Sequence, residues 1–257
     1  MKIRKTFQFK LKPSISQTQV LRNYMGCARF TYNKALVLQK ELYEKEQRKL
    51  SYPELVRYLV VWKKDAEISF LKEAPAQILQ QKLMDLEKSY VNFFKRGAGL
   101  PKFKKRGRRE TCRFPDAKQI TLDQKNKRVH LPKIGWVQYW KSRDVIGTLK
   151  NVTISYEGGD WFISFQVEQE IETSVHPSTS MAGIDLGIAY FATLSNGDQI
   201  PALNSLKKYS NALKCSQKKL SRKKKGSQNW KKHCKKLARK HKKIRNCRKD
   251  FLHKTST

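Results

Sequence analysis

Apolar and polar residues alternate in two parts of the chain. Residues 3–11 carry apolar side chains at alternate positions, with Lys5 the one exception, and this period of two predicts a half-buried strand. Strand signals return over 129–137. Two further alternating runs, 152–156 and 161–167, flank the turn-forming residues 157–160 and predict a β-hairpin.

Between these strand regions the apolar spacing changes to three and four residues. This spacing runs over 16–48 and predicts one long helix with an apolar face. A second helix is predicted over 52–64. A third follows Pro75, because apolar residues recur once per turn up to Phe94 and proline suits a first helical turn. Together they predict a compact helical bundle.

These elements predict an α+β protein. The simplest assembly places the strand at 3–11 with the later strands in one small β-barrel, interrupted by the helical bundle. A Ser-, Thr- and Pro-rich stretch, 173–180, predicts a linker into a second domain. That domain opens with two short apolar strands, 182–187 and 188–194. Two helices joined by a basic turn are then predicted after Leu206, because apolar residues recur there every seven positions.

The charge balance of the chain indicates what kind of partner it binds. The 257 residues include 56 Lys or Arg and 21 Asp or Glu, a net charge of +35, and the tail from Leu206 alone holds 21 Lys or Arg against one acid, Asp250. An apolar fraction of 39% excludes a wholly disordered basic tail. A fold with so much positive charge repels itself unless a polyanion binds it, so nucleic acid is the leading partner.

Targeting and cysteine patterns indicate an intracellular protein. The amino terminus is charged throughout and lacks the apolar block of a secretory signal, and the uncharged stretches are too short to span a membrane. The five cysteines are an odd number, widely spaced and without a CxxC pair. This pattern argues against disulfides and against a four-cysteine zinc site, so no zinc is predicted.

Two basic segments are candidates for nucleic-acid binding. Cations in the loop after the third helix and in the turn and helix of the tail would neutralise phosphates. These candidate residues are Lys102, Lys104, Lys105, Arg106, Arg108 and Arg109 in the loop, and Lys223, Lys224, Lys225, Lys231 and Lys232 in the tail. A solvated linker is the alternative for the loop. Gln77, Gln80 and Gln81 are possible base-reading residues, with surface helix filler as the alternative.

Asp185 is the most informative acidic residue. It stands in an apolar strand between glycines, where burying an unpaired carboxylate would be costly. It is either a turn-capping residue at a strand end or a Mg²⁺ ligand. Cleavage of a phosphodiester by two metal ions needs several convergent carboxylates. After Asp185, only Asp198 and Asp250 remain, and neither lies in a strand context like that of Asp185.

Four ordered segments resemble a known family. They are 26–35 (GCARFTYNKA), 87–106, the GIDLG motif at 183–187 with the LSNG at 194–197, and 225–254. Together they resemble the TnpB/OrfB proteins of bacterial insertion sequences, ancestral relatives of the type V CRISPR nucleases. This resemblance implies an RNA-guided DNA endonuclease in the bacterial cytoplasm, associated with the nucleoid, that binds a guide RNA and double-stranded DNA and reads a short motif beside its target.

The resemblance also implies an architecture and a metal. A wedge-like β-barrel would comprise 1–14 and 106–172, interrupted by a helical recognition insertion at 15–105. A linker at 173–181 would lead to the start of an RNase H-like (RuvC) domain at 182–257 with two basic helices. Asp185 would be the first of three catalytic carboxylates that coordinate Mg²⁺.

The sequence departs from the family pattern at its end. In the family a strand-borne Glu, a four-cysteine zinc ribbon and a final Asp follow the helix that closes this chain, and Thr257 comes before all three. The sequence therefore predicts a truncated chain that binds guide RNA and DNA and has lost Mg²⁺-dependent cleavage. The alternatives are an RNA-guided nuclease and a sequence-indifferent basic RNA-binding protein, and a steep salt slope without guide dependence would indicate the latter.

Overall fold

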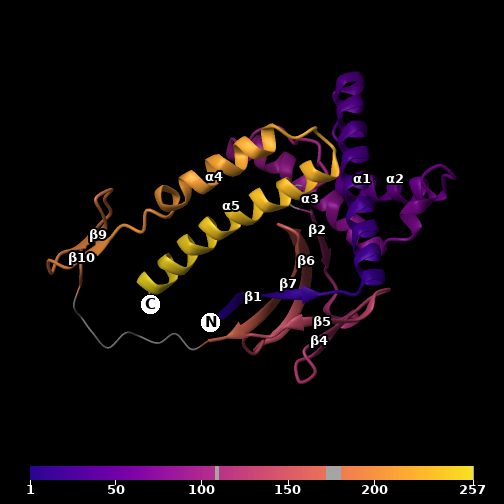
Figure 1. Ribbon diagram of the computed structural model, residues 1–257. Helices are drawn as coiled ribbons and strands as arrows, with labels where there is room; N and C mark the ends of the chain where they lie inside the picture. The colour runs from indigo at the N-terminus through magenta and orange to yellow at the C-terminus, as the bar shows by residue number, and fades with distance from the viewer. Residues whose placement is uncertain (108–109, 172–180, 257) are drawn as a thin grey trace. The chain divides into compact units, whose positions relative to one another are not determined.

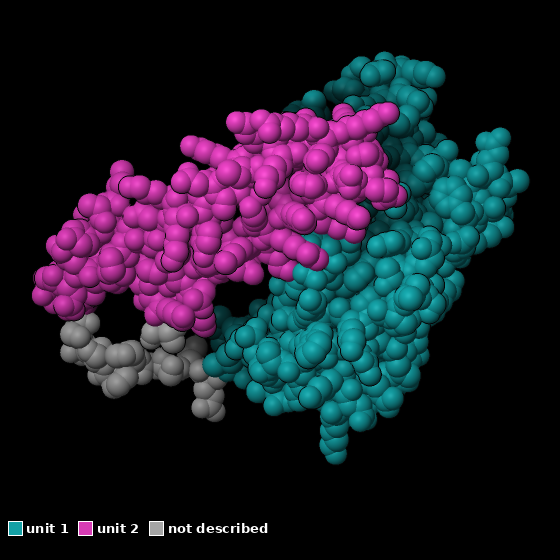
Figure 2. All heavy atoms as spheres, viewed as in Figure 1, with its two compact units in different colours: residues 1–171 teal, residues 172–257 magenta. Residues whose placement is uncertain are grey.

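A computed structural model describes residues 1–107, 110–171 and 181–256 of the chain. The chain divides into two compact units, Met1–Ile171 and Glu172–Thr257, which Figure 2 colours separately. Each unit is described by itself. The predicted linker at 173–181 lies outside the described residues except for Met181.

The first unit contains a curled, open sheet of seven antiparallel strands (Figure 1). The strands are β1 (Lys2–Lys12), β2 (Glu110–Phe114), β3 (Thr121–Asp123), β4 (Arg128–Leu131), β5 (Gly135–Trp140), β6 (Thr148–Glu157) and β7 (Asp160–Glu170). Their order is β2-β6-β7-β1-β5-β4-β3, so β2 and β3 form the two edges and the sheet is a half-barrel. The structure confirms the predicted first strand, which pairs with β7 on one side and β5 on the other.

The predicted hairpin is confirmed as β6 and β7, joined at Gly158 and Gly159. Both glycines have positive φ, 64° and 95°, as a two-residue hairpin turn requires. Alternation then buries one face of the sheet. Phe9 of β1 packs there against Tyr139 and Phe165, with ring centroids 5.4 and 5.9 Å apart. The opposite face of the sheet carries the polar and charged side chains of β1, together with Trp136, Gln138 and Trp140 of β5.

Between β1 and β2 the chain forms the predicted helices. They are α1 (Ile15–Glu46), α2 (Tyr52–Lys64) and α3 (Ala76–Arg96), with a short 3-10 turn η1 (Ser69–Lys72) before α3. Helix α1 begins at a capping box in which Ser14 and Gln17 exchange hydrogen bonds, and α3 ends at Gly97, which has a φ of 62°. Helices α1 and α3 pack on each other and against β2.

Three side-chain amides in the first unit each hold the backbone of a distant residue by two hydrogen bonds. Gln39 of α1, almost fully buried, donates to the carbonyl of Leu50 (2.8 Å) and accepts from its N–H (3.0 Å). Gln124 holds Val145 in the same way, at 2.9 and 2.8 Å. The third amide belongs to Asn33 and is described with the site. These pairs fix loops that the helices and strands do not hold themselves.

The second unit is a small sheet and a helical hairpin. Its strands are β8 (Ile184–Asp185), β9 (Tyr190–Leu194) and β10 (Gln199–Pro201), in the order β10-β9-β8. Helices α4 (Ser205–Ser221) and α5 (Gln228–Thr255) follow, as the heptad spacing predicts, and they pack on each other. The apolar strand predicted at 182–187 is wrong in extent, because regular pairing covers two residues and residues 181–190 are exposed.

Few side chains of the second unit are buried. Ala192, Leu213 and Ile244 are its buried apolar residues among those described, and Phe191 of β9 meets Phe251 of α5 with ring centroids 5.1 Å apart. Across the described residues, no helix combines the length and apolar character that crossing a membrane would require.

Candidate nucleic-acid interface

The basic loop between α3 and β2 lies along helix α1. The backbone N–H of Lys104 donates to Oδ1 of Asn33 at 2.8 Å, and Nδ2 of Asn33 donates to the Lys104 carbonyl at 3.1 Å. Pro101 is buried, whereas Lys102, Lys104, Lys105 and Arg106 are exposed. The loop is therefore anchored through its backbone while its cationic side chains face solvent.

Lysines around this loop lie over aromatic rings. Nζ of Lys104 is 4.7 Å from the ring centroid of Tyr32, and Nζ of Lys40 is 5.3 Å from that of Phe103. Such cation–π contacts restrict the ammonium groups without neutralising them. The result is a set of positioned cations without an ion pair among the described residues, which is the arrangement that a phosphate backbone requires.

The loop enters β2 beside a charged pair. Arg29 of α1 pairs with Glu110 at the start of β2 at 2.5 Å, and Lys82 of α3 donates to the hydroxyl of Thr111 at 3.3 Å. These contacts tie the start of β2 to both helices. Arg108 and Arg109, two of the predicted cations, lie outside the described residues.

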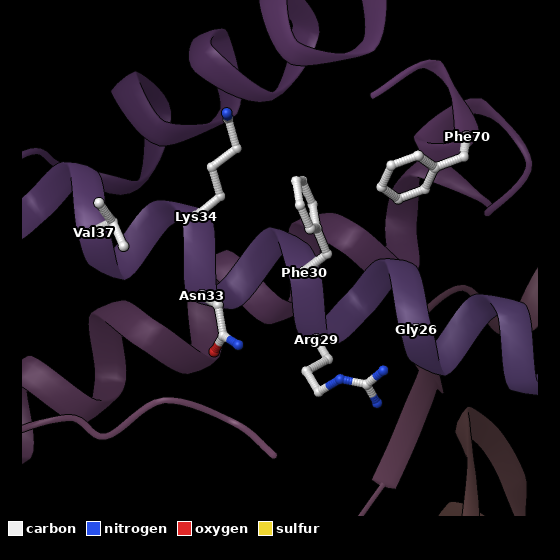
Figure 3. Close-up of a pocket in the computed structure, with 7 residues that line it drawn as sticks. All are labelled: Gly26, Arg29, Phe30, Asn33, Lys34, Val37 and Phe70. Atoms are coloured by element: carbon white, nitrogen blue, oxygen red, sulfur yellow. The ribbon is translucent and has the colours of Figure 1, made fainter. Parts of the chain in front are cut away.

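A shallow depression of ≈ 600 Å³ lies on the α1 surface near Phe70 of η1. Figure 3 shows Phe30 and Phe70 pointing toward each other, with Arg29 and Asn33 on the opposite side of the helix from Lys34. The two phenyl rings meet edge to face at 5.2 Å, and Nζ of Lys34 lies 5.5 Å from the ring centroid of Trp62. The depression is therefore lined by two aromatic rings, Phe30 and Phe70, and by the ammonium group of Lys34.

The predicted base-reading glutamines lie near the start of α3. Gln77, Gln80 and Gln81 are all half-buried, and Nε2 of Gln81 is 3.3 Å from the sulfur of Met84. This contact favours a helix-surface role for Gln81. Their part in base reading stays a prediction.

The predicted cations of the tail lie at the junction of α4 and α5. Lys223, Lys224 and Lys225 occupy the turn, in which Gly226 has a φ of 87°, and Lys231 and Lys232 lie near the start of α5. All five are exposed. The two helices hold one another through small contacts, among them Nζ of Lys240 on the carbonyl of Ala212 at 2.7 Å.

Asp185 is exposed at the end of β8, opposite Thr193 of β9. The expectation of a carboxylate within a buried strand is therefore wrong, because β8 has no second layer of described side chains over it. The other two described acids of this unit are engaged elsewhere. Asp198 accepts from the amide of Asn196 at 2.7 Å, and Asp250 pairs with Lys254 at 2.9 Å.

Among the described residues, no group of three or more His, Cys, Asp or Glu side chains is placed to hold a metal ion. Cys215 is exposed and Cys234 and Cys247 are half-buried on the tail helices.

Sequence reasoning missed two features of the first unit. The Asn33–Lys104 pair spans 71 positions and leaves no local signal. The second feature is a pair of exposed tryptophans, Trp136 and Trp140, on β5. Their signal is present in the sequence, because Gly135–Trp140 alternates and places both rings on the face opposite Val137 and Tyr139.

The fold and these surfaces define a class: a mixed α+β protein whose positioned cations suit nucleic acid. Family models agree on a mobile-element origin. Residues 164–257 match the IS605 OrfB model, described as "Probable transposase", and residues 1–48 match the IS605 OrfB model described as "Helix-turn-helix domain". In the structure, 1–48 form a strand and one long helix. The chain belongs to the TnpB/OrfB family of IS605-type insertion-sequence proteins.

Two curated relatives match along the whole chain. One, from Escherichia coli (strain K12), is 45% identical over 257 residues and carries the name "Putative RNA-guided DNA endonuclease InsQ". The other, from Streptomyces pristinaespiralis, is 32% identical over 259 residues and is called "Putative RNA-guided DNA endonuclease". The matches cover 100% and 99% of this chain but 63% and 64% of the relatives, so the chain spans less than two thirds of their length.

A solved structure also aligns, weakly. The cryo-EM structure of a Cas12f1–sgRNA–target DNA complex covers 99% of this chain and 71% of its own, at 16% identity and a TM-score of 0.37. A score of this size does not support a shared fold.

A nuclease family implies a divalent metal ion, and the described residues do not fit one. Asp185 is a single exposed carboxylate, and the two acids that follow it in the sequence, Asp198 and Asp250, are engaged with Asn196 and Lys254. A hard cation takes several oxygen ligands, and no convergent set exists among the described side chains.

Proposed function

We propose that this chain binds a guide RNA and double-stranded target DNA as part of RNA-guided DNA recognition by a mobile element. The observation that carries the proposal is the basic loop held against α1 by Asn33, because a solvated linker would have no need of a fixed backbone. Family membership and the relatives' names support the guided mode of recognition. In that mode base pairing reads the sequence while protein cations hold the backbones.

The proposal assigns roles to the two units. The curled sheet of the first unit corresponds to the wedge-like β-barrel, and α1 to α3 correspond to the recognition insertion. The second unit corresponds to the start of an RNase H-like domain, with Asp185 as an inherited catalytic position. The cationic turn and helix at Lys223–Lys225, Lys231 and Lys232 supply a second binding surface.

We propose binding without cleavage for these 257 residues. The support is chemical: phosphodiester hydrolysis by metal ions needs convergent carboxylates, and Asp185 has none beside it among the described side chains. Incubating the chain with guide RNA, matched DNA and Mg²⁺ should leave the DNA intact. Mg²⁺-dependent cutting that disappears in Asp185→Ala would overturn this part of the proposal.

The binding proposal is tested by salt dependence. We expect the fourfold variant Lys102→Ala, Lys104→Ala, Lys105→Ala, Arg106→Ala to weaken binding of duplex DNA and to reduce the slope of log K against log salt by up to about 3.6, since each lost phosphate contact removes about 0.9. A control variant removes equal charge from exposed lysines outside the loop. It replaces Lys64, Lys72, Lys118 and Lys125 with alanine.

Two outcomes would contradict the proposal. Equal slopes for the loop variant and its control would show that the loop holds no phosphate in particular. Equal retention of matched and scrambled DNA on the guide-loaded chain would remove guide dependence and would indicate a sequence-indifferent basic protein. The cationic surface of α5, with Asp250 its one acid, is what favours that second candidate.

A further inference from the structure

The outward face of strand β5 carries two exposed tryptophans in one line. Trp136 is 42% exposed and Trp140 is 62% exposed, with the exposed Gln138 between them. The residues that alternate with them, Val137 and Tyr139, belong to the buried core. Four residues of strand place the two tryptophan positions roughly 13 Å apart on one surface.

A cation lies against each of these rings. The guanidinium carbon of Arg128 on β4 is 4.5 Å from the centroid of Trp136, and Nζ of Lys12 on β1 is 5.9 Å from that of Trp140. His130 meets Trp136 edge to face at 5.4 Å. Large rings paired with cations on a solvent-facing sheet are the elements from which single-strand binding surfaces are built.

The surface is held in place before any ligand binds. Nε of Arg128 donates to Asp123 at 3.0 Å, which directs the guanidinium to Trp136, and Asp123 is itself fixed by the backbone N–H of Asn126 at 3.0 Å. At the same tryptophan, Nε2 of Gln17 at the start of α1 donates to the backbone carbonyl of Trp136 at 2.8 Å. The strand cannot shift its register without breaking these contacts.

The charge of this face favours a polyanion. Two carboxylates on this face of the sheet already have partners, Asp123 with Arg128 and Asp160 with Lys10 at 3.0 Å. Lys12 forms no ion pair with any described residue and is exposed beside Trp140. A strand of phosphates could therefore approach without displacing an existing salt bridge at Lys12.

We propose that this face binds the unpaired nucleotides of a single strand, with bases stacked on Trp136 and Trp140 and phosphates near Lys12 and Arg128. Base stacking on a tryptophan requires an unstacked base, so paired duplex is not the ligand. The inference rests on the proposed function in one respect: a guide RNA would supply such a strand. It uses a different surface from the Lys102–Arg106 loop, so the two can fail separately.

The test uses the full 257-residue chain and twelve-nucleotide probes: oligouridylate RNA, oligothymidylate DNA and a blunt DNA duplex. We expect Trp140→Leu and Trp136→Leu each to weaken binding of the single strands by about 5- to 140-fold, because leucine keeps apolar surface but offers no ring. Trp140→Phe should restore most of the affinity. Binding of the duplex should change less than twofold. Thermal unfolding of each variant serves as the check on folding.

Tighter binding of RNA than DNA would identify the guide as the source of the strand, and equal binding would support the site for either. The inference fails if the folded leucine variants bind single strands as the parent chain does, or if they lose duplex and single strand equally. A chain that binds duplex through the Lys102–Arg106 loop, with tryptophan variants unaffected, overturns this inference and leaves the proposed function standing. A chain that binds none of the three probes overturns both this inference and the proposed function.

Discussion

Replacing Asn33 with alanine removes both hydrogen bonds that hold the Lys104 backbone against α1. Each such bond contributes about 0.5–1.5 kcal/mol, so the loop loses about 1–3 kcal/mol of local stability. That free energy corresponds to an open loop populated about 5- to 140-fold more often. Asn33 is half-buried and Lys104 exposed, so the loss should stay local and the unfolding midpoint of the chain should move little.

Hydrogen exchange at the Lys104 amide and limited trypsin cleavage at Lys102–Arg106 both report this opening, since cleavage follows the population of the open loop. Both should accelerate in Asn33→Ala. Asn23→Ala is the matched control: it lies on the same helix and donates one long bond, 3.5 Å, to Glu73. The reasoning is refuted if Asn33→Ala exchanges and cleaves at the parent rate, or if Asn23→Ala accelerates the loop equally.

Three further results are expected. Gln39→Ala should lower the free energy of unfolding, measured by chemical denaturation, by about 1–3 kcal/mol or more, because it leaves the buried backbone N–H and carbonyl of Leu50 unpaired. Hydrogen bonds from Asn126, followed by the contacts with Arg128, lower the pKa of Asp123 to about 2. Since an unfolded Asp titrates near 3.9, the stability contributed by Asp123 should be complete above about pH 4 and lost as the pH falls through about 2. An NMR titration of the Asp123 carboxyl measures its pKa in the folded chain, and a midpoint near 3.9 would contradict the expectation. Burial raises the pKa of the Cys112 thiol to about 12, so iodoacetamide at pH 8 should label the exposed Cys215 and leave Cys112 unlabelled until urea unfolds the chain.

The helices and the central strands could be predicted from the local spacing of apolar residues. Helix α2 spans Tyr52–Lys64 as predicted, because an apolar face, Ser51 before it and Pro53 in its first turn all agree. The β6–β7 hairpin follows from alternation on both sides of two glycines. These features depend on neighbours within a few residues, so the sequence contains them.

Contacts between residues far apart in the sequence could not be predicted from local spacing. Asn33 and Lys104 meet across 71 positions, and nothing near either residue marks the other. The burial expected around Asp185 failed for a related reason: an apolar strand is buried only if a second layer covers it, and the apolar content of 182–187 does not say which segment would do so. The exposed ring of Trp140 was readable from strand alternation once Val137 and Tyr139 were assigned inward.

Strand β8 has no partner on one edge among the described residues, and apolar side chains beside that edge face water. Ile184 is 65% exposed, Leu186 70% and Ile188 97%. Such an edge is a template for another extended segment, including the same edge of a second copy. Mutual repulsion between the cationic copies opposes that pairing, and added salt weakens the repulsion. Light scattering from the purified chain should therefore rise with both protein concentration and ionic strength, and Ile188→Lys should suppress the rise.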